Sequence, residues 1–273
     1  MPIFSSSFAF DKLLVSKERR KVKTNKDKKN TEYLLRRFNS LNISPQTAII
    51  TGSGIKLFRD KAPIFEVSYS ELTKQRIKGH EEILKVYRVR NESVLVFSGR
   101  KHLYEGLSFS DVTANVRLCY KLGIKKLIIT NAAGGISKNL KAGDLMLITG
   151  FIDLMQATER GILNGITQPP FKIKTRLTVF LKRKLKSGIY AGMQGPSYET
   201  YSEIKLLQSL GASAVGMSTV PEIICAKSLG MNYAAVSVIS NVWNKNHKPS
   251  HKEVLEQVKR VNKKLNDLIS RLI

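Results

Sequence analysis

The chain has 273 residues, a length that fits one large α/β domain or two modest ones. Hydrophobic residues make up 42% of it, which argues against global disorder, and no apolar run reaches the ~18 residues that a membrane helix requires. Lys and Arg total 46 against 21 Asp and Glu, and the net charge of +25 raises the question of nucleic-acid or membrane-surface partners.

The basic residues concentrate in two stretches, Lys17 to Lys29 and Lys172 to Lys186, of which the second contains no acidic residue. Elsewhere the lysines are scattered, and none of the common nucleic-acid-binding motifs is present. This distribution favours a solvated, Lys-biased surface over a dedicated polyanion site, so we expect no dedicated nucleic-acid or membrane partner. In either case a positive field attracts small anionic substrates, of which phosphate is one.

The first 30 residues are predicted to form a basic, loosely ordered extension to a single domain of residues 31–273. At the start of the chain, charge follows the apolar residues rather than preceding them, and a small-residue cleavage site is lacking, which disfavours a secretory signal. Cys119 and Cys225 lie in predicted helices, where two buried, reduced thiols are more typical than a disulfide. These features favour a cytoplasmic protein.

The first predicted elements precede a glycine turn. A short helix at Thr31 to Asn39 is followed by an apolar strand at Thr47 to Thr51, which enters the turn Gly52-Ser53-Gly54. Ile83 to Ser98 is predicted to form a hairpin that turns at Asn91-Glu92.

After the hairpin, helices and strands alternate along the chain. Asp111 to Leu122 carries apolar residues at helical spacing, and the buried strand Leu127 to Thr130 follows it. Later strands are predicted around Asp144–Ile152, Ile189–Met193, Ala214–Gly216 and Ala234–Ile239, and later helices near Thr200–Leu210 and Pro221–Leu229. A last helix is indicated by apolar residues at steps of three and four from Val254 to Leu272. This alternation predicts a single α/β domain with a twisted, mostly parallel mixed central sheet flanked by helices.

Polar and glycine-rich segments follow the apolar runs. They are Gly52 to Gly54, Gly99 to Gly106, Asn131 to Gly135, Gly195 to Thr200, Gly216 to Glu222 and Ser240-Asn241. In an open α/β sheet ligands bind at the carboxyl ends of the strands, so these segments form the candidate site. Each also has a plain structural alternative: a tight turn for Gly52 to Gly54, surface charge for Arg100 and His102, a helix start for Glu199 and Ser218, core packing for Met217, and a turn for Asn241.

The order of these segments carries more information than any one of them. The chain contains in succession GSG, GRxHxYEG, TNAAGG, GDLMLI, GPSYET, VGMSTVPE and a Ser-x-Ile-Ser-Asn segment followed by SHKEV. From about Lys29 to the C-terminus it closely resembles the trimeric, low-molecular-mass purine nucleoside phosphorylases, whose relatives include the methylthioadenosine phosphorylases. The resemblance implies a homotrimeric pentosyltransferase of purine salvage, which cleaves purine ribonucleosides or 2′-deoxyribonucleosides with inorganic phosphate to free base and (deoxy)ribose 1-phosphate.

The resemblance also implies a role for each matching residue. Phosphate would be bound by Ser53, Arg100, His102, the backbone at Ala132, and Ser218, with His80 over the same site. Ribose would be bound by Tyr104, Met217 and His251. The base would lie near Ala132, Gly134, Tyr198, Val215 and Met217, and its edge would contact Glu199 and Asn241. Asn241, Glu199 and His102 are the residues expected to act in catalysis.

Phosphorolysis explains why these residue types are needed. The transition state has oxocarbenium character, so the phosphate dianion stabilises the positive charge that grows on the ribose. A hydrogen bond from Asn241 to purine N7 stabilises the negative charge on the leaving base, and the Glu199 carboxylate accepts from N1–H of a 6-oxopurine. We expect no cofactor and no metal, since inorganic phosphate is itself the co-substrate.

Specificity would depend on Asn241, where methylthioadenosine phosphorylases carry aspartate. An amide serves N7 and O6 of a 6-oxopurine, whereas a protonated aspartic acid serves the N6 amine of adenine, so Asn241 favours inosine and guanosine. The alternatives are a phosphorylase of methylthioadenosine or adenosine, and a basic nucleic-acid-binding scaffold that has lost catalysis.

Two segments depart from the family pattern. Gly150 to Thr178 is shorter than the usual loop, and it leaves Phe171 as the candidate for an aromatic residue that reaches a neighbouring subunit's ribose. Trp243, the only tryptophan, lies where small residues are usual, and it fits either a cap on the base pocket or a core position.

Overall fold

The computed structural model describes residues 25–68, 83–155, 170–244 and 250–273, apart from the side chains of 25–28 and 251. Residues 1–24 of the predicted extension therefore lie outside the described residues, as does His80. The first described element is the helix α2 (Asn25–Ser40), which begins before the predicted Thr31. α2 is continuous across residue 30, and the division of the chain into residues 1–30 and 31–273 stays a prediction.

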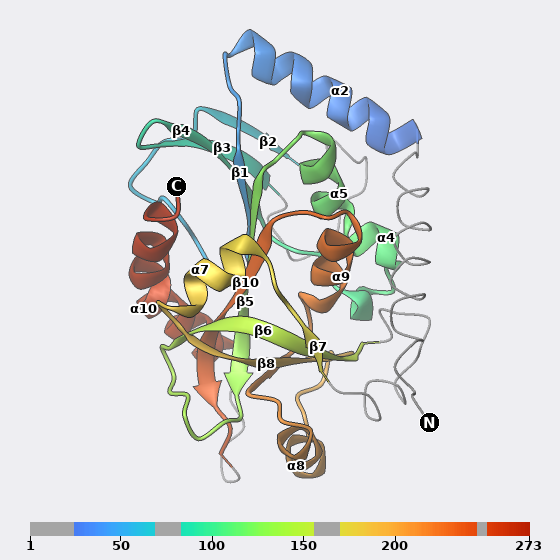
Figure 1. The fold of residues 1–273 in the computed structure, drawn as a ribbon, viewed down its shortest axis with the longest axis vertical. Helices are drawn as coiled ribbons and strands as arrows, with labels where there is room; N and C mark the ends of the chain where they lie inside the picture. The colour runs from blue at the N-terminus through green and yellow to red at the C-terminus, as the bar shows by residue number, and fades with distance from the viewer. Residues whose placement is uncertain (1–24, 69–82, 156–169, 245–249) are drawn as a thin grey trace.

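The described residues contain one sheet of ten strands at the centre of the molecule (Figure 1). In chain order the strands are β1 (Thr47–Ile50), β2 (Phe65–Ser68), β3 (Ile83–Val89), β4 (Glu92–Ser98), β5 (Lys126–Gly135), β6 (Leu145–Leu154), β7 (Phe171–Lys172), β8 (Lys186–Met193), β9 (Ala214–Gly216) and β10 (Tyr233–Val242). All four residues of β1 are buried, as expected of a strand that is covered on both faces.

The sheet closes on itself at one end. β10, β6, β8, β9 and β5 are neighbours in that order, and β10 also pairs with β5, so these strands form a ring. From β5 the sheet continues through β1, β4 and β3 to β2. The closure depends on two pairings, β10–β6 and β5–β9, between strands that are distant in sequence.

Both strand directions occur in the sheet. Parallel pairings join β1 to β4 and β5, β10 to β5, and β8 to β6 and β9. Antiparallel pairings join β2 to β3, β3 to β4, β10 to β6, β5 to β9 and β6 to β7. The predicted α/β domain with a mixed central sheet is confirmed, as is the predicted hairpin of β3 and β4. The antiparallel share is larger than a mostly parallel sheet implies, since the ring closes through antiparallel neighbours.

Helices cover both faces of this sheet (Figure 1). Besides α2 they are α4 (Phe109–Val112), α5 (Ala114–Lys121), α7 (Arg176–Lys182), α8 (Tyr201–Ser209), α9 (Val220–Ser228) and α10 (His251–Ser270), together with the short 3-10 helix η1 (Leu103–Glu105). Alternate residues of β1 separate the two faces: Ala48 and Ile50 pack in a cluster with α2, α5 and α9, whereas Ile49 packs with α7 and α10. A third cluster joins α8 to the ring strands.

The sequence of α10 explains its position. Ser250 and Glu253 form a capping box, in which Ser250 Oγ accepts from the Glu253 backbone and the Glu253 carboxylate accepts from the Ser250 backbone. The predicted apolar stripe is confirmed, because Val258 and Leu265 are fully buried. Burial of each such side chain contributes about 1.5–3 kcal/mol, so the stripe holds α10 against β10.

Three elements differ from their predicted limits. The predicted helix Asp111 to Leu122 is divided into α4 and α5 at Thr113, whose hydroxyl donates to the Phe109 carbonyl over 2.7 Å. β5 and β10 extend beyond their apolar runs, because Asn241 continues the ladder by pairing with Gly134. The segments predicted as loops after these strands are therefore the last residues of the strands themselves.

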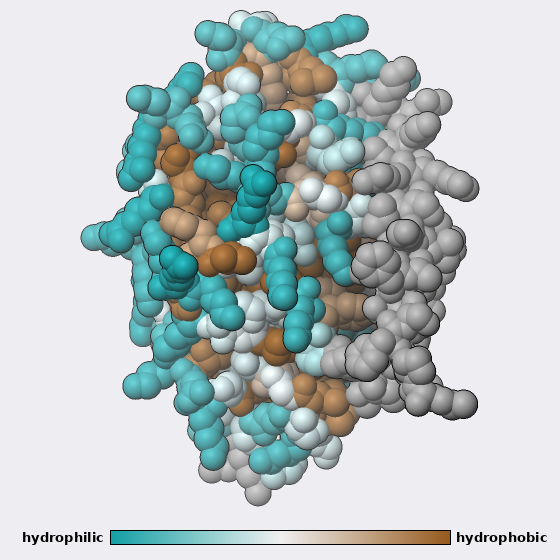
Figure 2. Space-filling view, in the orientation of Figure 1, coloured by the Kyte–Doolittle hydropathy of each residue, from teal (hydrophilic) through white to brown (hydrophobic). Residues whose placement is uncertain are grey.

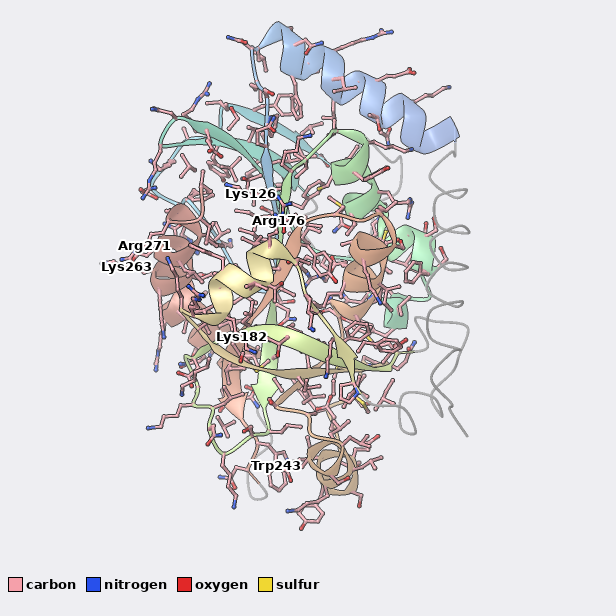
Figure 3. All side chains as sticks on the ribbon, viewed as in Figure 1. Lys126, Arg176, Lys182, Trp243, Lys263 and Arg271 are labelled. Atoms are coloured by element: carbon pink, nitrogen blue, oxygen red, sulfur yellow. The ribbon has the colours of Figure 1, made fainter. Side chains whose placement is uncertain are left out.

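One face of the molecule is strongly basic. Lys126, Arg176, Lys182, Lys263 and Arg271 all lie on the face that α7 and α10 cover, whereas Trp243 lies at the far end beside α8 (Figure 3). Long hydrophilic side chains cover this face, with apolar residues exposed between them (Figure 2). Within the described ranges, every helix is too short or too polar to cross a bilayer.

Candidate active site

A cavity of about 240 Å³ lies where the carboxyl ends of several strands meet. Its walls come from the segments that follow β1, β4, β8 and β9 and from the last residues of β5 and β10. The lining residues include Gly52, Ser53, Arg100, His102, Tyr104, Ala132, Ala133, Gly134, Tyr198, Glu199, Val215, Gly216, Met217, Ser218, Ser240, Asn241 and Trp243. Six stretches of sequence that span almost two hundred residues therefore contribute to one pocket.

Every predicted site residue whose side chain the structure describes lines this cavity. These residues are Ser53, Arg100, His102, Tyr104, Ala132, Gly134, Tyr198, Glu199, Val215, Met217, Ser218 and Asn241. His80 and the side chain of His251 lie outside the described residues. The structure thus brings the described residues together, while the individual roles stay predictions.

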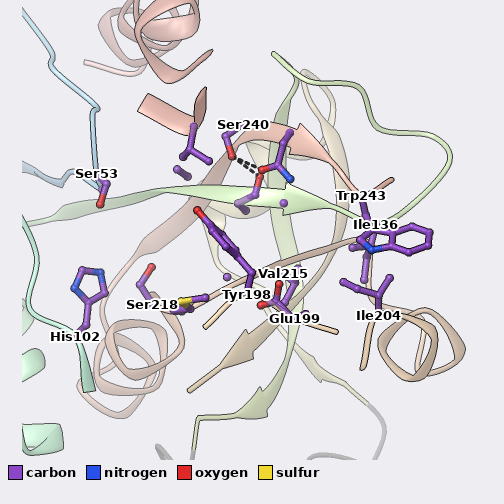
Figure 4. Close-up of a pocket in the computed structure, with 18 of the residues that line it drawn as sticks. Ser53, His102, Ile136, Tyr198, Glu199, Ile204, Val215, Ser218, Ser240 and Trp243 are labelled. Carbon is purple, nitrogen blue, oxygen red and sulfur yellow. Dashed lines mark hydrogen bonds between the residues drawn. The ribbon is translucent and has the colours of Figure 1, made fainter. Parts of the chain in front are cut away.

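The cavity has two chemically different ends (Figure 4). Ser53, His102 and Ser218 lie at one end, and Ile136, Ile204 and Trp243 lie at the other. Tyr198, Glu199 and Val215 lie between them (Figure 4). The hydroxyl-rich and imidazole-bearing end suits an oxyanion, whereas the apolar end suits a flat heterocycle.

Arg100 is fixed at the polar end. Its guanidinium donates through Nε to Glu222 Oε1 over 3.1 Å, and Nη2 lies 2.8 Å from Glu222 Oε2. Nη1 donates to the Thr130 carbonyl over 2.9 Å and lies 3.4 Å from Ser218 Oγ. Arg100 and Glu222 are 4% and 2% exposed, so this ion pair is almost fully removed from water.

Ser218 occupies a sharp turn between β9 and α9. Its backbone N–H donates to the buried hydroxyl of Tyr190 over 3.4 Å, and its Oγ lies 3.1 Å from Thr219 Oγ1. Thr219 has φ of 74°, a conformation that is rare for a β-branched residue and costs about 1–3 kcal/mol. Asn131 Nδ2 donates to Thr219 Oγ1 over 2.8 Å and helps to hold this turn at the start of α9. The turn presents Ser218 to the cavity next to a helix N-terminus, a position that favours anions.

His102 and Tyr104 form a stacked pair beside this turn. The two rings have centroids 4.7 Å apart at an interplanar angle of 15°. Nδ1 of His102 lies 3.0 Å from Glu105 Oε1, and because a carboxylate only accepts, Nδ1 carries the proton in this contact. Burial, with a smaller contribution from Glu105, raises the pKa of the Tyr104 hydroxyl, so Tyr104 is a neutral donor at neutral pH.

Glycines bring the walls of the cavity close together. Gly195, at φ of 73°, lies against Met217 and Tyr104, where a Cβ atom would approach the Met217 sulfur to 2.6 Å. A Cβ at Gly52 would lie 2.8 Å from Asn131 Cα, so the turn after β1 needs glycine to pack on β5. Gly195 therefore packs against two of the three predicted ribose-binding residues, and Gly52 positions the turn that carries Ser53.

Glu199 lies in the middle of the cavity with an unused acceptor. Its Oε1 is buried and has no hydrogen-bond partner among the described residues. Burial raises the pKa of the Glu199 carboxyl above its ordinary value, and the negative charge of Glu203 adds to the effect. A buried carboxyl oxygen without a partner is costly, and a ligand N–H at this point removes that cost.

The side-chain amide of Asn241 is oriented by a hydrogen bond from its neighbour Ser240, which Figure 4 labels. The register between β10 and β5 shifts between Ile239 and Asn241, and this bulge at Ser240 redirects the side chains that follow it. Ser240 Oγ lies 2.9 Å from Asn241 Oδ1 and 3.3 Å from the Ala133 carbonyl, and we assign its proton to the shorter contact. Because Oδ1 accepts from Ser240, the donor nitrogen Nδ2 is the end of the amide that serves a ligand.

The floor and the apolar end complete the cavity. Gly134 lies between Asn241 and Val215, and a Cβ atom there would contact both side chains at 3.6 Å. Trp243 lines the cavity and packs beside Tyr201, with ring centroids 5.7 Å apart. Trp243 is thus half-buried against the cluster of α8 and also lines the cavity, and its role as a cap on the base stays a prediction. Phe171 stacks on Phe151 of its own chain and is not among the residues that line this cavity.

The sequence analysis missed two residues that shape the polar end. Glu222 and Tyr190 do not belong to the predicted site, although Glu222 lies within a quoted motif. A hint was present for Glu222, since it is an acidic residue in an otherwise apolar helix start. Tyr190 gave no such hint, because a tyrosine in a strand is ordinary core.

The two cysteines behave as expected of buried thiols. Cys119 on α5 and Cys225 on α9 are both buried and are not joined in a disulfide, and burial raises the pKa of the Cys119 thiol. In the part of the chain that the structure describes, no group of three His, Cys, Asp or Glu side chains is arranged to hold a metal ion.

Comparison with known proteins assigns the chain to one family. The model of the phosphorylase superfamily matches residues 46–273. The chain is 34% identical over 241 residues to purine nucleoside phosphorylase 1 of Bacillus subtilis (strain 168), a match that covers 80% of this chain and 88% of that protein. It is also 34% identical over 257 residues to purine nucleoside phosphorylase of Bos taurus, with 84% of this chain and 88% of that protein covered.

Solved structures give the same result. A Schistosoma purine nucleoside phosphorylase in complex with hypoxanthine superposes with a TM-score of 0.71 and 27% identity, over 89% of this chain and 95% of that one. A Schistosoma mansoni purine nucleoside phosphorylase in complex with adenosine superposes with a TM-score of 0.72 over the same shares. From its sequence, its fold and the cavity at its strand ends, the chain belongs to the phosphorylase superfamily, and within it to the purine nucleoside phosphorylases.

Proposed function

We propose that this phosphorylase acts in purine salvage in the cytoplasm and prefers inosine and guanosine, in the ribo or 2′-deoxyribo form, over adenosine and methylthioadenosine. Inorganic phosphate is the second substrate, and the reaction needs neither a cofactor nor a metal. The products are the free 6-oxopurine and ribose 1-phosphate or its 2′-deoxy counterpart. We further propose that the enzyme works as a homotrimer, as its sequence resemblance implies.

The direction of the Asn241 amide carries the proposed preference. Because Ser240 donates to Oδ1, the two hydrogens of Nδ2 remain for the ligand. A 6-oxopurine offers two acceptors on this edge, N7 and O6, whereas adenine offers N7 and an amino group. The amino group would meet a second donor, and a mismatched buried pair is strongly disfavoured.

Glu199 supports the same preference from the opposite edge of the base. Its Oε1, which no described residue contacts through a hydrogen bond, can accept N1–H of hypoxanthine or guanine, and guanine adds a 2-amino donor. Adenine carries an acceptor at N1 and would place a lone pair against the carboxylate. Both base-reading groups are therefore complementary to a 6-oxopurine, with a donor at Asn241 and an acceptor at Glu199.

The residues at the polar end provide the phosphate side of the reaction. Arg100 supplies a fixed charge, and Ser218, Ser53 and the start of α9 supply neutral donors. A dianion bound there would lie on the face of the ribose opposite the base and stabilise the oxocarbenium-like sugar. As the bond from C1′ to N9 breaks, its electron pair passes to the purine, and the Asn241 donor stabilises that charge at N7.

Product analysis tests this proposal. Purified enzyme is incubated with inosine, guanosine, adenosine and methylthioadenosine, each with and without phosphate, and the released base and sugar phosphate are measured by chromatography. We expect release to require phosphate and kcat/KM to be highest for inosine or guanosine. Release of adenine alone would overturn the assigned preference, and equal release without phosphate would overturn phosphorolysis.

A further inference from the structure

Arg100 is held in place by a buried acidic residue, Glu222. Glu222 lies in the first turn of α9 and contacts the guanidinium through both carboxylate oxygens, at 3.1 Å to Nε and 2.8 Å to Nη2. A two-point contact of this kind fixes the plane of the guanidinium, which a single contact does not. Glu222 is 122 residues from Arg100 in the sequence, so the pair also joins α9 to the end of β4.

Glu222 is itself held in place from another helix. Asn115 of α5 donates from Nδ2 to Glu222 Oε1 over 3.2 Å, and its own Oδ1 accepts from the Val116 backbone over 2.8 Å. Asn115 is 8% exposed and Glu222 is 2% exposed. The chain Asn115–Glu222–Arg100 is therefore a buried polar network with one end anchored in α5 and the other at the cavity.

The geometry determines which donors Arg100 has left for a ligand. A guanidinium has five N–H groups. Glu222 accepts from Nε and lies 2.8 Å from Nη2 as an ion pair, and the Thr130 carbonyl accepts one hydrogen of Nη1. The remaining hydrogens belong to Nη1 and Nη2, the edge next to Ser218. Glu222 thus turns the donor edge of Arg100 toward the hydroxyl with which it would share an oxyanion.

We propose that Glu222 is a positioning residue for phosphate, which acts by orienting Arg100 and makes no contact with substrate. This inference rests on the phosphate role proposed above for Arg100. A buried pair that existed only for stability would affect folding without favouring one substrate. A positioning role instead confines the effect to phosphate, because Glu222 contacts Arg100 and Asn115, neither of which is predicted to contact the base or the ribose.

Kinetic analysis of Glu222→Gln tests the proposal. The amide keeps the size of the side chain but places an N–H donor against the guanidinium, so the two-point contact is lost. We expect KM for phosphate to rise about tenfold, while KM for inosine changes less than about twofold. Glu222→Asp keeps the charge but is shorter, and it should recover part of the phosphate affinity.

Two variants keep the test decisive if Glu222→Gln folds poorly. Asn115→Ala leaves Glu222 and Arg100 in place but removes the hydrogen bond to Glu222 Oε1, together with the one from the Val116 backbone, and it should raise KM for phosphate about threefold. Asp144→Asn, which breaks the exposed ion pair with Lys186, is the control and should leave both KM values unchanged. Thermal unfolding of every variant separates loss of structure from loss of orientation.

The outcomes distinguish this inference from the function on which it rests. Arg100→Lys is measured alongside, and a phosphate KM that does not respond to it would overturn the phosphate role of Arg100. If Arg100→Lys weakens phosphate but the Glu222 and Asn115 variants do not, the positioning role is wrong. Tighter phosphate binding in Glu222→Gln would also contradict the positioning role, because it would mean that the negative charge of Glu222 only opposes the binding of phosphate. An equal rise in both KM values would indicate a general structural role.

Discussion

At the scale of single residues, Glu199 is the group whose ionisation matters most. Burial raises the pKa of its carboxyl, because the charged form loses water and a hydrogen bond with its own backbone offsets only part of that loss. The ionised carboxylate is the form that accepts N1–H, so base binding favours loss of its proton and lowers its pKa. The N1–H of the base thus supplies a donor for Glu199 Oε1, which has no hydrogen-bond partner among the described residues.

The first residue-scale prediction follows from this coupling. As pH falls through the raised pKa of Glu199, the carboxylate is protonated and kcat/KM for inosine decreases, at a higher pH than an exposed glutamate would produce. Glu199→Gln should lower kcat/KM for inosine about 100-fold at neutral pH and remove this acid limb. A pH profile of both proteins checks this, and an unchanged acid limb in Glu199→Gln would contradict it.

A second residue-scale prediction concerns Asn241. Asn241→Asp replaces a fixed donor by a group that accepts when ionised, so kcat/KM for adenosine relative to inosine should rise by about tenfold or more. Competition between the two nucleosides in one reaction measures this ratio directly. Ser240→Ala is the matched variant, because it frees Oδ1 and should weaken discrimination without reversing it. Identical ratios in wild type and Asn241→Asp would remove Asn241 from base recognition.

At the scale of elements, the turn from β9 to α9 depends on close packing beneath it. A Cβ at Gly216 would lie 2.6 Å from the Tyr190 hydroxyl, the group that accepts from the Ser218 backbone. Burial raises the pKa of Tyr190 to about 12, so this hydroxyl is neutral at physiological pH. Gly216 therefore leaves room for the Tyr190 side chain, and the Tyr190 hydroxyl in turn holds the Ser218 backbone. We refer to these three residues as the stack.

The element-scale prediction uses this stack. Gly216→Ala should reduce the free energy of unfolding by about 1–3 kcal/mol and raise KM for phosphate, because Tyr190 has to move away from Ser218. Tyr190→Phe is the control, since it removes the hydrogen bond without adding a Cβ and should cost less stability. Chemical denaturation and phosphate titration check both effects. Full stability in Gly216→Ala would show that the stack can relax.

Elements also show what the sequence could and could not predict. Alternating apolar runs and helical spacing predicted the buried part of β5 and the stripe of α10, since these patterns are local. They could not predict that Asn131 to Gly135 lies within β5, because that length depends on pairing with β9 and β10. The predicted site residues could be found from the sequence because each lies in a polar or glycine-rich segment that follows an apolar run. Glu222 and Tyr190 could not be found in this way, because they act through contacts with distant segments.

At the scale of the whole molecule, the net charge of +25 affects the encounter with phosphate. Basic side chains cover the face of α7 and α10 and create a positive field around the molecule (Figure 3). A field of this kind raises the local concentration of an anion and leaves a neutral nucleoside unaffected. Salt screens it over about 8–10 Å at physiological ionic strength.

The whole-molecule prediction is a difference in salt dependence between the two substrates. Raising sodium chloride from about 20 mM to about 300 mM should lower kcat/KM for phosphate about threefold and leave kcat/KM for inosine nearly constant. Initial rates at constant pH measure both values. An equal loss for both substrates would indicate that salt changes the protein rather than the approach of phosphate.

In the proposed mode of binding, one cavity holds the purine against Glu199 and Asn241 and the phosphate against Arg100 and Ser218. A crystal structure of the protein with hypoxanthine and phosphate bound tests it most directly. We expect N1 to face the Glu199 carboxylate, N7 to face Asn241 Nδ2, and the phosphate oxygens to lie within hydrogen-bond distance of Arg100 and Ser218. A base bound away from Glu199 and Asn241, or a phosphate bound away from Arg100, would contradict the account.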